Sequence, residues 1–299
     1  MSQKVRKAVI PAAGFGTRFL PATKAFPKEM LPIVDKPVIQ YIVESLVEAG
    51  ITDIIIVTGY TKRSIEDHFD VTNHALVENL KAGGDKKIHL LEEIEAISQL
   101  ANFSYVRQKG PYGNATPLLN VRNLIGNEPF IYTWADDFIQ AKKPEFKQLL
   151  EVADKYPNAP ILAAIAAKGE EDYQKFGFAG GKKLAPGIID VAEVVEKPGK
   201  DQAPSNLALV SGMILTPEIY NYFDEAYEQS GDREVNYIDA LKLMIQDGKQ
   251  VIAAEIQGGK HFDTGNKLEY LKTVVEFALA RDDLGPDFRT FLEETLRRS

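Results

Sequence analysis

The sequence predicts an α/β protein, a Rossmann-like three-layer α/β/α sandwich with a mixed, mostly parallel central sheet. Short apolar runs of strand length alternate with longer amphipathic segments over most of the 299 residues. Such alternation is typical of a largely parallel sheet covered by helices on both faces. One run, DIIIVTG at 53–59, is apolar almost throughout, as expected of a strand that is buried on both faces.

The same reading assigns each element in turn. Strands are expected at 7–13, 53–59, 103–108, 129–137, 160–167, 190–197, 207–215 and 251–256. The segment 36–50 predicts a helix, because Pro37 suits a first helical turn and Gly50 suits a C-terminal stop. Further helices are expected near 61–69, 88–101, 144–156, 217–229, 236–247, 267–282 and 285–297. The absence of repeats and linkers predicts one domain over 1–299.

Composition excludes several classes of function. The chain has no cysteine, which excludes disulfides and zinc–thiolate sites, and its four histidines show no paired metal-ligand spacing. A net charge of −8 argues against a broad nucleic-acid-binding face. The basic N-terminus precedes only a short apolar stretch, broken by Pro11, and no later run approaches the ~20 apolar residues of a membrane span. A cytoplasmic protein without nucleic-acid or membrane partners is expected.

The first strand leads into an unusual loop, within AVIPAAGFGTRFLPATKAFPKEMLPI at 8–33. Two glycines are followed by Arg18, Lys24 and Lys28, although the chain as a whole is acidic. A solvated basic stretch and a phosphate site are the two alternatives. The phosphate site is favoured, because small residues let backbone N–H groups approach a ligand and cations neutralise phosphate oxygens.

This loop departs from the two common phosphate-binding motifs. It begins like the dinucleotide fingerprint, but Phe19 replaces the third glycine and Pro21 follows where a helix should be under way. It also lacks the glycine–lysine–serine ending of a P-loop. The first connection is therefore expected to be long and irregular, with a helix only from about Pro37, and a Rossmann dehydrogenase is disfavoured.

The loop sequence itself is more specific. Residues 14–37 read GFGTRFLPATKAFPKEMLPIVDKP. This stretch resembles the signature of sugar-1-phosphate nucleotidyltransferases, in particular the bacterial UTP–glucose-1-phosphate uridylyltransferases. The resemblance continues along nearly the whole chain, in VRQ (106–108), GNEPF (126–130), DD (136–137), VVEKP (194–198), APSNLA (203–208) and DTGNKLEYL (263–271).

The resemblance implies a reaction and its requirements. A phosphate oxygen of glucose 1-phosphate would attack the α-phosphorus of UTP, so that UDP-glucose forms and pyrophosphate leaves, with Mg²⁺ as cofactor. Such a displacement needs positioning and cations, not a protein nucleophile. The absence of any Cys or Ser–His arrangement fits this requirement. The family precedent also implies a homodimer or homotetramer, with the C-terminal helices at about 267–299 available for oligomerisation.

By the same resemblance, the first loop holds the nucleotide. The backbone of Ala12, Ala13 and Gly14 would hold the base, while Arg18 and Lys28 would hold the triphosphate as catalytic residues. Read without the family, the glycines would indicate only a tight turn.

Five later positions are implied to bind the nucleoside and the sugar. Gln108 carries an amide that suits the mixed edge of uracil, and Gly113 would let the next loop close over the nucleoside. Gly177 would place its backbone against the sugar. Glu196 would accept from sugar hydroxyls, and Lys197 would bind the sugar phosphate. A surface glutamine and an ordinary strand exit remain the alternatives for Gln108 and for the Glu196–Lys197 pair.

Two aspartates are implied to hold Mg²⁺. Asp136, also counted as catalytic, and Asp263 are each expected at the end of a strand, on the carboxyl edge of the sheet, where ligands collect. Asp137 is expected to support Asp136 or to cap a helix.

Some motifs depart from the family pattern. The usual Gly-Leu-Gly-His-Ala reads GNATP at 113–117, the common pair near the sugar is Ser211-Gly212, and REVNYIDAL stands at 233–241. These changes border the nucleoside and the sugar, so dTTP or another hexose 1-phosphate stays open. A non-catalytic, nucleotide-sugar-binding regulatory paralogue is disfavoured, because the phosphate and metal positions are intact.

Overall fold

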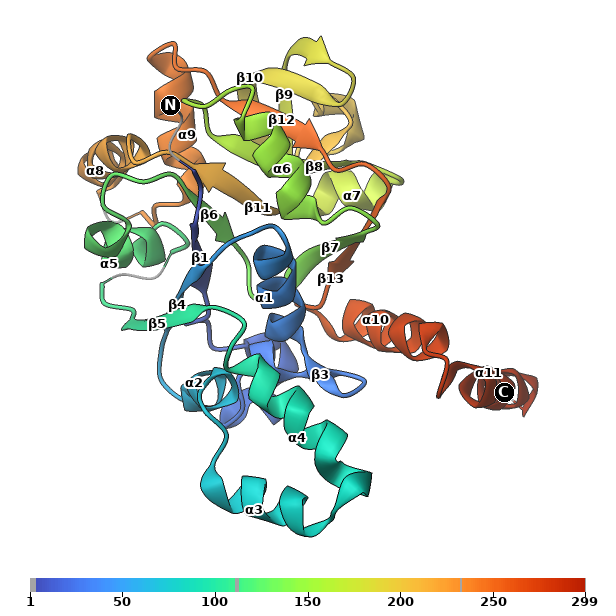
Figure 1. Cartoon of the computed structure of the whole chain (residues 1–299). Helices are drawn as coiled ribbons and strands as arrows, with labels where there is room; N and C mark the ends of the chain where they lie inside the picture. The colour runs from blue at the N-terminus through green and yellow to red at the C-terminus, as the bar shows by residue number, and fades with distance from the viewer. Residues whose placement is uncertain (1–3, 111–112, 232, 299) are drawn as a thin grey trace.

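The computed structural model describes residues 4–110, 113–231 and 233–298. Its main sheet has nine strands in the order β5-β4-β1-β6-β11-β8-β12-β10-β9 (Figure 1). Seven strands run in one direction, and only β10 and β11 run against them, which confirms the predicted mixed, mostly parallel sheet. The strands are β1 (Lys7–Pro11), β4 (Asp53–Thr58), β5 (Asn102–Arg107), β6 (Phe130–Thr133), β8 (Ile161–Ala166), β9 (Gly177–Ala185), β10 (Ile188–Glu196), β11 (Leu207–Leu215) and β12 (Ile252–Glu255).

Two separate apolar cores lie on the two faces of this sheet. Alternating residues of one strand supply both, since Ala8 and Ile10 of β1 belong to one core and Val9 to the other. The first core is closed by α1 (Val38–Glu48), α2 (Arg63–Phe69) and α6 (Glu145–Ala153). The second is closed by α5 (Thr116–Ile125), α8 (Ile219–Ser230) and α9 (Tyr237–Gln246). The predicted three-layer sandwich is confirmed.

The connection after β1 is irregular, as the sequence predicts. Three short 3₁₀ turns follow one another, η1 (Thr17–Phe19), η2 (Ala22–Lys24) and η3 (Lys28–Met30). A two-stranded hairpin comes next, of β2 (Pro32–Ile33) and β3 (Lys36–Pro37). The first α-helix begins only at Val38, with Pro37 as its N-cap.

Several elements were not predicted. Strand β9 forms the edge of the main sheet, where it pairs antiparallel with β10. The expected strand 129–137 is divided, because β6 ends at Thr133 and β7 (Asp137–Ala141) pairs instead with β13 (Gly259–Asp263) in a separate two-stranded sheet. The additional helices are α3 (His74–Ala82) and α7 (Glu170–Lys175), while α4 (Asp85–Ile97) starts earlier than expected.

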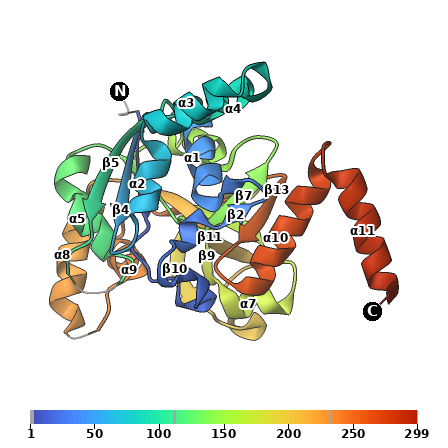
Figure 2. The same ribbon diagram turned by 90° about the horizontal axis from the view of Figure 1, so that it is seen from below.

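The C-terminal helices leave the sandwich. Figures 1 and 2 both show α10 (Lys267–Ala280) and α11 (Gly285–Arg298) leading away from the sheet, and α11 packs against α10. Among the described residues of α11 only Gly285 is buried. Within the described part of the chain, no helix combines the length and the apolar character needed to cross a bilayer.

Candidate active site

Four of the predicted phosphate and metal residues meet around one glycine. Lys28 Nζ donates to Asp136 Oδ2 at 2.6 Å, and Arg18 Nη1 donates to the carbonyl of Gly265 at 3.4 Å. A Cβ atom on Gly265 would lie 2.9 Å from Asp263 Oδ1, 3.2 Å from Asp136 Oδ2 and 3.4 Å from Arg18 Nη1. Three segments far apart in the sequence therefore converge at a point where a side chain on residue 265 would be crowded.

Local hydrogen bonds shape this convergence. Gly16, at the start of η1, has a φ of 64°, which a residue with a side chain adopts only with strain. Its carbonyl accepts from Thr23 Oγ1 at 2.7 Å, which folds the loop back on itself. On the opposite side, the backbone N–H and the hydroxyl of Thr264 both donate to the Asp136 carbonyl, at 2.9 and 2.8 Å. This pair of bonds holds the segment after Asp263 against Asp136.

The strand assignment of the two aspartates holds only in part. Asp263 does end a strand, but this strand is β13 of the separate two-stranded sheet, and Asp136 lies in the link between β6 and β7. The register of the small sheet places Asp263 opposite Asp137, the residue after Asp136. The pairing of β13 with β7, not the main sheet, therefore brings Asp263 close to Asp136. Asp137 caps no helix; it begins β7, and its Oδ1 lies 2.5 Å from His261 Nε2.

The charges of the cluster perturb one another. Burial would lower the pKa of Lys28, but the Asp136 carboxylate and then Glu29 outweigh it, so the pKa of Lys28 is raised. Burial raises the pKa of Asp263, and the neighbouring Asp137 and Asp136 carboxylates raise it further. The hydrogen bond that Asp263 accepts from the Gly265 N–H lowers this pKa, but by less. The site holds concentrated charge of both signs.

The donor set fits Mg²⁺ in part. The described residues contain no group of three or more His, Cys, Asp or Glu side chains arranged for a metal ion. Two carboxylates do converge, since Asp136 Oδ2 and Asp263 Oδ1 both border Gly265. Because Mg²⁺ typically takes one or two carboxylates and completes its shell with phosphates and waters, two converging carboxylates suit it.

The predicted base-binding backbone lies at the carboxyl edge of the sheet. Ala12 is buried, and its N–H donates to the Val57 carbonyl at 2.8 Å. Gly59 approaches Ala13 so closely that a Cβ would lie 3.1 Å from the Ala13 carbonyl. Gln108 directly follows β5, two strands away from β1. Ala12, Ala13, Gly14 and Gln108 therefore share one edge of the sheet.

The departure at 113–117 has a structural role. Gly113 has a φ of 141°, and a Cβ there would lie 2.8 Å from the Val235 carbonyl. The side-chain oxygen of Asn114 accepts from the Tyr237 N–H at 2.9 Å, and its carbonyl accepts from the Tyr132 hydroxyl at 2.6 Å. Asn114 thus ties this loop to the start of α9.

The predicted sugar-binding residues form a second group. Gly177 begins β9 opposite Glu196, and a Cβ on Gly177 would lie 2.9 Å from Glu196 Oε2. Lys197 follows with a φ of 47°, and its N–H donates to the Phe176 carbonyl at 3.0 Å. Both charged side chains are exposed, and no hydrogen bond or ion pair among the described residues joins this group to the Lys28–Asp136 pair.

Sequence reasoning missed a buried carboxyl near Asp137 and His261. Glu145 is fully buried, and its Oε2 accepts from the hydroxyl of Ser211 at 2.5 Å. Ser211 has a φ of 65°, and its carbonyl accepts from Trp134 N–H, just before the site aspartates. Burial raises the pKa of Glu145 to about 8, although the Ser211 bond opposes the shift. In the sequence, Glu145 resembles an ordinary acidic residue of a first helical turn.

Glu145→Gln is expected to make the fold more stable above pH 5. The unfolded carboxyl releases its proton above about pH 4.5 and the folded one above about 8, so wild-type stability falls as the pH rises through this window. Glutamine ionises in neither state, so the free energy of unfolding of the variant, relative to wild type, should rise by up to about 1.4 kcal/mol per pH unit across this window. Thermal or urea unfolding from pH 5 to 9 measures this; parallel curves for the two proteins would contradict it.

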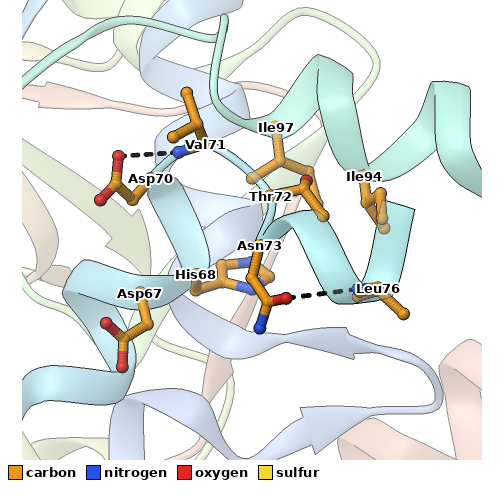
Figure 3. Close-up of a pocket in the computed structure, with 9 residues that line it drawn as sticks. All are labelled: Asp67, His68, Asp70, Val71, Thr72, Asn73, Leu76, Ile94 and Ile97. Atoms are coloured by element: carbon orange, nitrogen blue, oxygen red, sulfur yellow. Dashed lines mark hydrogen bonds between the residues drawn. The ribbon is translucent and has the colours of Figure 1, made fainter. Parts of the chain in front are cut away.

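A hollow of about 570 Å³ lies elsewhere, between α2, α3 and α4 (Figure 3). Asp67 and Asp70 line it, and its one histidine, His68, bonds Gln40 at 2.8 Å and has a pKa lowered by burial. No lysine or arginine is among its lining residues. Two carboxylates without a cation would repel a phosphate, so this hollow does not suit the anionic ligand predicted for the glycine loop.

Comparison with known proteins agrees with the geometry. A family profile described as nucleotidyl transferase matches residues 7–278. A UTP–glucose-1-phosphate uridylyltransferase of Bacillus subtilis is 44% identical over 296 residues, covering 99% of each chain.

Two solved structures extend the comparison. A UTP-bound UDP-glucose pyrophosphorylase from Acinetobacter baumannii superposes with a TM-score of 0.86 at 33% identity, over 97% of this chain and 99% of that one. A UDP-glucose pyrophosphorylase in complex with UDP-glucose has a TM-score of 0.79 at 38% identity, over 93% of this chain and all of that one. The resemblance inferred from residues 14–37 is confirmed, and the chain belongs to the nucleotidyl transferase family.

Proposed function

We propose that this protein is a UTP–glucose-1-phosphate uridylyltransferase, which forms UDP-glucose and pyrophosphate. The observation that carries the proposal is the convergence of Arg18, Asp136 and Asp263 on Gly265, with Lys28 bonded to Asp136. Full-length relatives carry this name, and similar structures hold UTP or UDP-glucose.

The chemistry follows from the charges. A phosphate oxygen of glucose 1-phosphate forms a bond to the α-phosphorus of UTP, and the bond to pyrophosphate breaks. Both reactants are anionic, so the barrier contains mutual repulsion and charge that grows on the leaving group. Arg18 and Lys28 would neutralise that charge. Lys28 would exchange Asp136, its partner in the structure, for a phosphate oxygen.

Mg²⁺ is the proposed cofactor. Asp136 and Asp263 would hold it, because their oxygens border the same glycine and the charges around Asp263 already repel one another. The ion would supply further neutralisation of the phosphates. Asp136 would be available to hold the ion once Lys28 binds a phosphate oxygen.

The remaining residues are assigned by their positions. The backbone of Ala12 to Gly14, together with Gln108 and Gly113, would bind the nucleoside at the edge formed by β1, β4 and β5. Gly177, Glu196 and Lys197 would bind the sugar phosphate. The tie made by Asn114 alters the nucleoside side of the site, so dTTP or another hexose 1-phosphate is the second candidate substrate.

A screen of nucleoside triphosphates against sugar 1-phosphates, read by pyrophosphate release with Mg²⁺, tests the proposal. UTP with glucose 1-phosphate should give the highest kcat/KM, and the reverse reaction should form UTP from UDP-glucose and pyrophosphate. Preference for dTTP or another sugar would move the assignment to the second candidate. No release from any pair would favour a non-catalytic nucleotide-sugar-binding protein.

We further propose one catalytic domain whose terminal helices join copies into a homodimer or homotetramer. Leu268 and Leu271 of α10 and Phe291 of α11 are exposed on helices that leave the sandwich (Figure 2). A second copy would cover these apolar side chains. Phe291→Glu should lower the mass in sedimentation equilibrium; an unchanged mass would remove α11 from the interface.

A cytoplasmic location is proposed because the triphosphate substrate is an intracellular metabolite.

A further inference from the structure

A buried ion pair lies directly behind the proposed triphosphate site. Lys62 Nζ donates to Glu29 Oε2 at 2.7 Å, and the two side chains are 4% and 0% exposed. Glu29 is the immediate neighbour of Lys28, which pairs with Asp136 in the site. Nothing in the proposed reaction uses either member of this buried pair.

The pair connects two segments that are far apart in the sequence. Glu29 belongs to η3 in the glycine loop, and Lys62 is the N-cap residue of α2, shortly after β4. Thr61, just before it, has a φ of 62°. The bond therefore fastens the loop segment that carries Lys28 to the start of α2, just beyond β4.

Stability alone is a weak reason for such a pair. Burial raises the pKa of Glu29 and lowers that of Lys62, so each charge is unfavourable by itself. Moreover, Glu29 Oε1 is buried without a hydrogen-bond partner among the described residues. Apolar side chains of similar volume would fill such a place at less cost in free energy. The cost of removing two charges from water offsets much of the attraction between them.

The position of the pair supplies a better reason. The side chains of Lys28 and Glu29 have separate partners, Asp136 on one side and Lys62 on the other. If Lys28 moves from Asp136 to a phosphate, as the proposed function requires, its backbone must stay in place for the ammonium to reach the phosphate. The bond made by Glu29 holds the backbone of the adjacent residue.

We propose that the Glu29–Lys62 ion pair positions Lys28 for the triphosphate, by fixing η3 to the start of α2 while the Lys28 side chain exchanges partners. Both members are positioning residues and touch no substrate. The inference rests on the proposed function, since it assigns Lys28 to the triphosphate of UTP.

The double variant Glu29→Gln/Lys62→Met is the main test, because it removes both charges and leaves neither buried alone. Loss of such outer support typically costs about 10–100-fold in activity. A decrease of this size is expected in kcat for UDP-glucose formation, with less change in KM for UTP. The melting temperature is measured alongside, and the single variant Lys62→Met is included for comparison.

A double-mutant cycle with Lys28→Met separates positioning from general damage. If the pair acts through Lys28, the double variant should cost little further activity once Lys28 is absent. Glu128→Gln is the control, matched in distance: it breaks an ion pair of the same 2.7 Å length with Lys7, and a longer one with Arg6, at a partly exposed place near the amino end of β1. That variant should leave kcat unchanged in each background, at the wild-type value when Lys28 is present and at the Lys28→Met value when it is not.

Two results would overturn the inference while leaving the function intact: wild-type kcat in the double variant, or a loss that multiplies fully with that of Lys28→Met. A wild-type protein that releases no pyrophosphate from any substrate pair would overturn the proposed function itself, and the inference with it. A loss of kcat that the double variant shows only when Lys28 is present, and not in the Lys28→Met protein, supports the positioning role.

Discussion

Asp136→Asn is expected to lower kcat for pyrophosphate release on the order of 10³-fold, at the upper end of the usual cost of losing one preorganised electrostatic group. Asparagine keeps the size of the side chain but removes the charge that would anchor Mg²⁺. The fold should survive, because Asp136 lies outside both apolar cores and its side chain is 17% exposed. Steady-state kinetics at saturating UTP, glucose 1-phosphate and Mg²⁺, with a melting curve, measure both effects.

The structure offers an internal check on this variant. Asp136 pairs with Lys28, so Asp136→Asn also frees Lys28. If pairing were its only role, the freed lysine should bind UTP at least as tightly and activity should persist. Asp137→Asn is the comparison, since Asp137 bonds His261 and should cost less. Near wild-type activity of the Asp136 variant at saturating Mg²⁺ would show that Asp136 is not the metal ligand, and Asp137 would then be the next candidate.

The sequence predicted those parts of the fold whose residues carry a local signal. The segment Asp53–Thr58 is apolar and β-branched enough to be recognised as a buried strand without knowledge of its neighbours. The edge strand Gly177–Ala185 has five glycine and lysine residues among nine, and nothing local favours a strand. It forms because β10 supplies an antiparallel partner, which a local pattern does not reveal.

The site shows the same division. Arg18 and Lys28 stand in one contiguous motif, so their shared role could be predicted from the sequence and from its resemblance to a family. The approach of Asp263 to Asp136 depends on the pairing of β13 with β7, which replaced the single strand expected at 129–137. The bond between Ser211 and Glu145 joins residues 66 positions apart in the chain, and no spacing rule indicates it.

Arg18→Ala is expected to lower kcat about 10²–10³-fold, with a smaller effect on KM for UTP, because its interaction strengthens as charge grows on departing pyrophosphate. Arg18→Lys should recover only part, since lysine lacks the planar two-pronged donor geometry. Lys24→Ala is the matched control, an exposed cation of the same loop to which no phosphate is assigned. Its loss should be clearly smaller at equal melting temperature. Equal mild losses at both positions would mean that the loop acts only as a diffuse positive field. Arg18, which lies at Gly265 in the structure, would then have no direct role in binding the triphosphate.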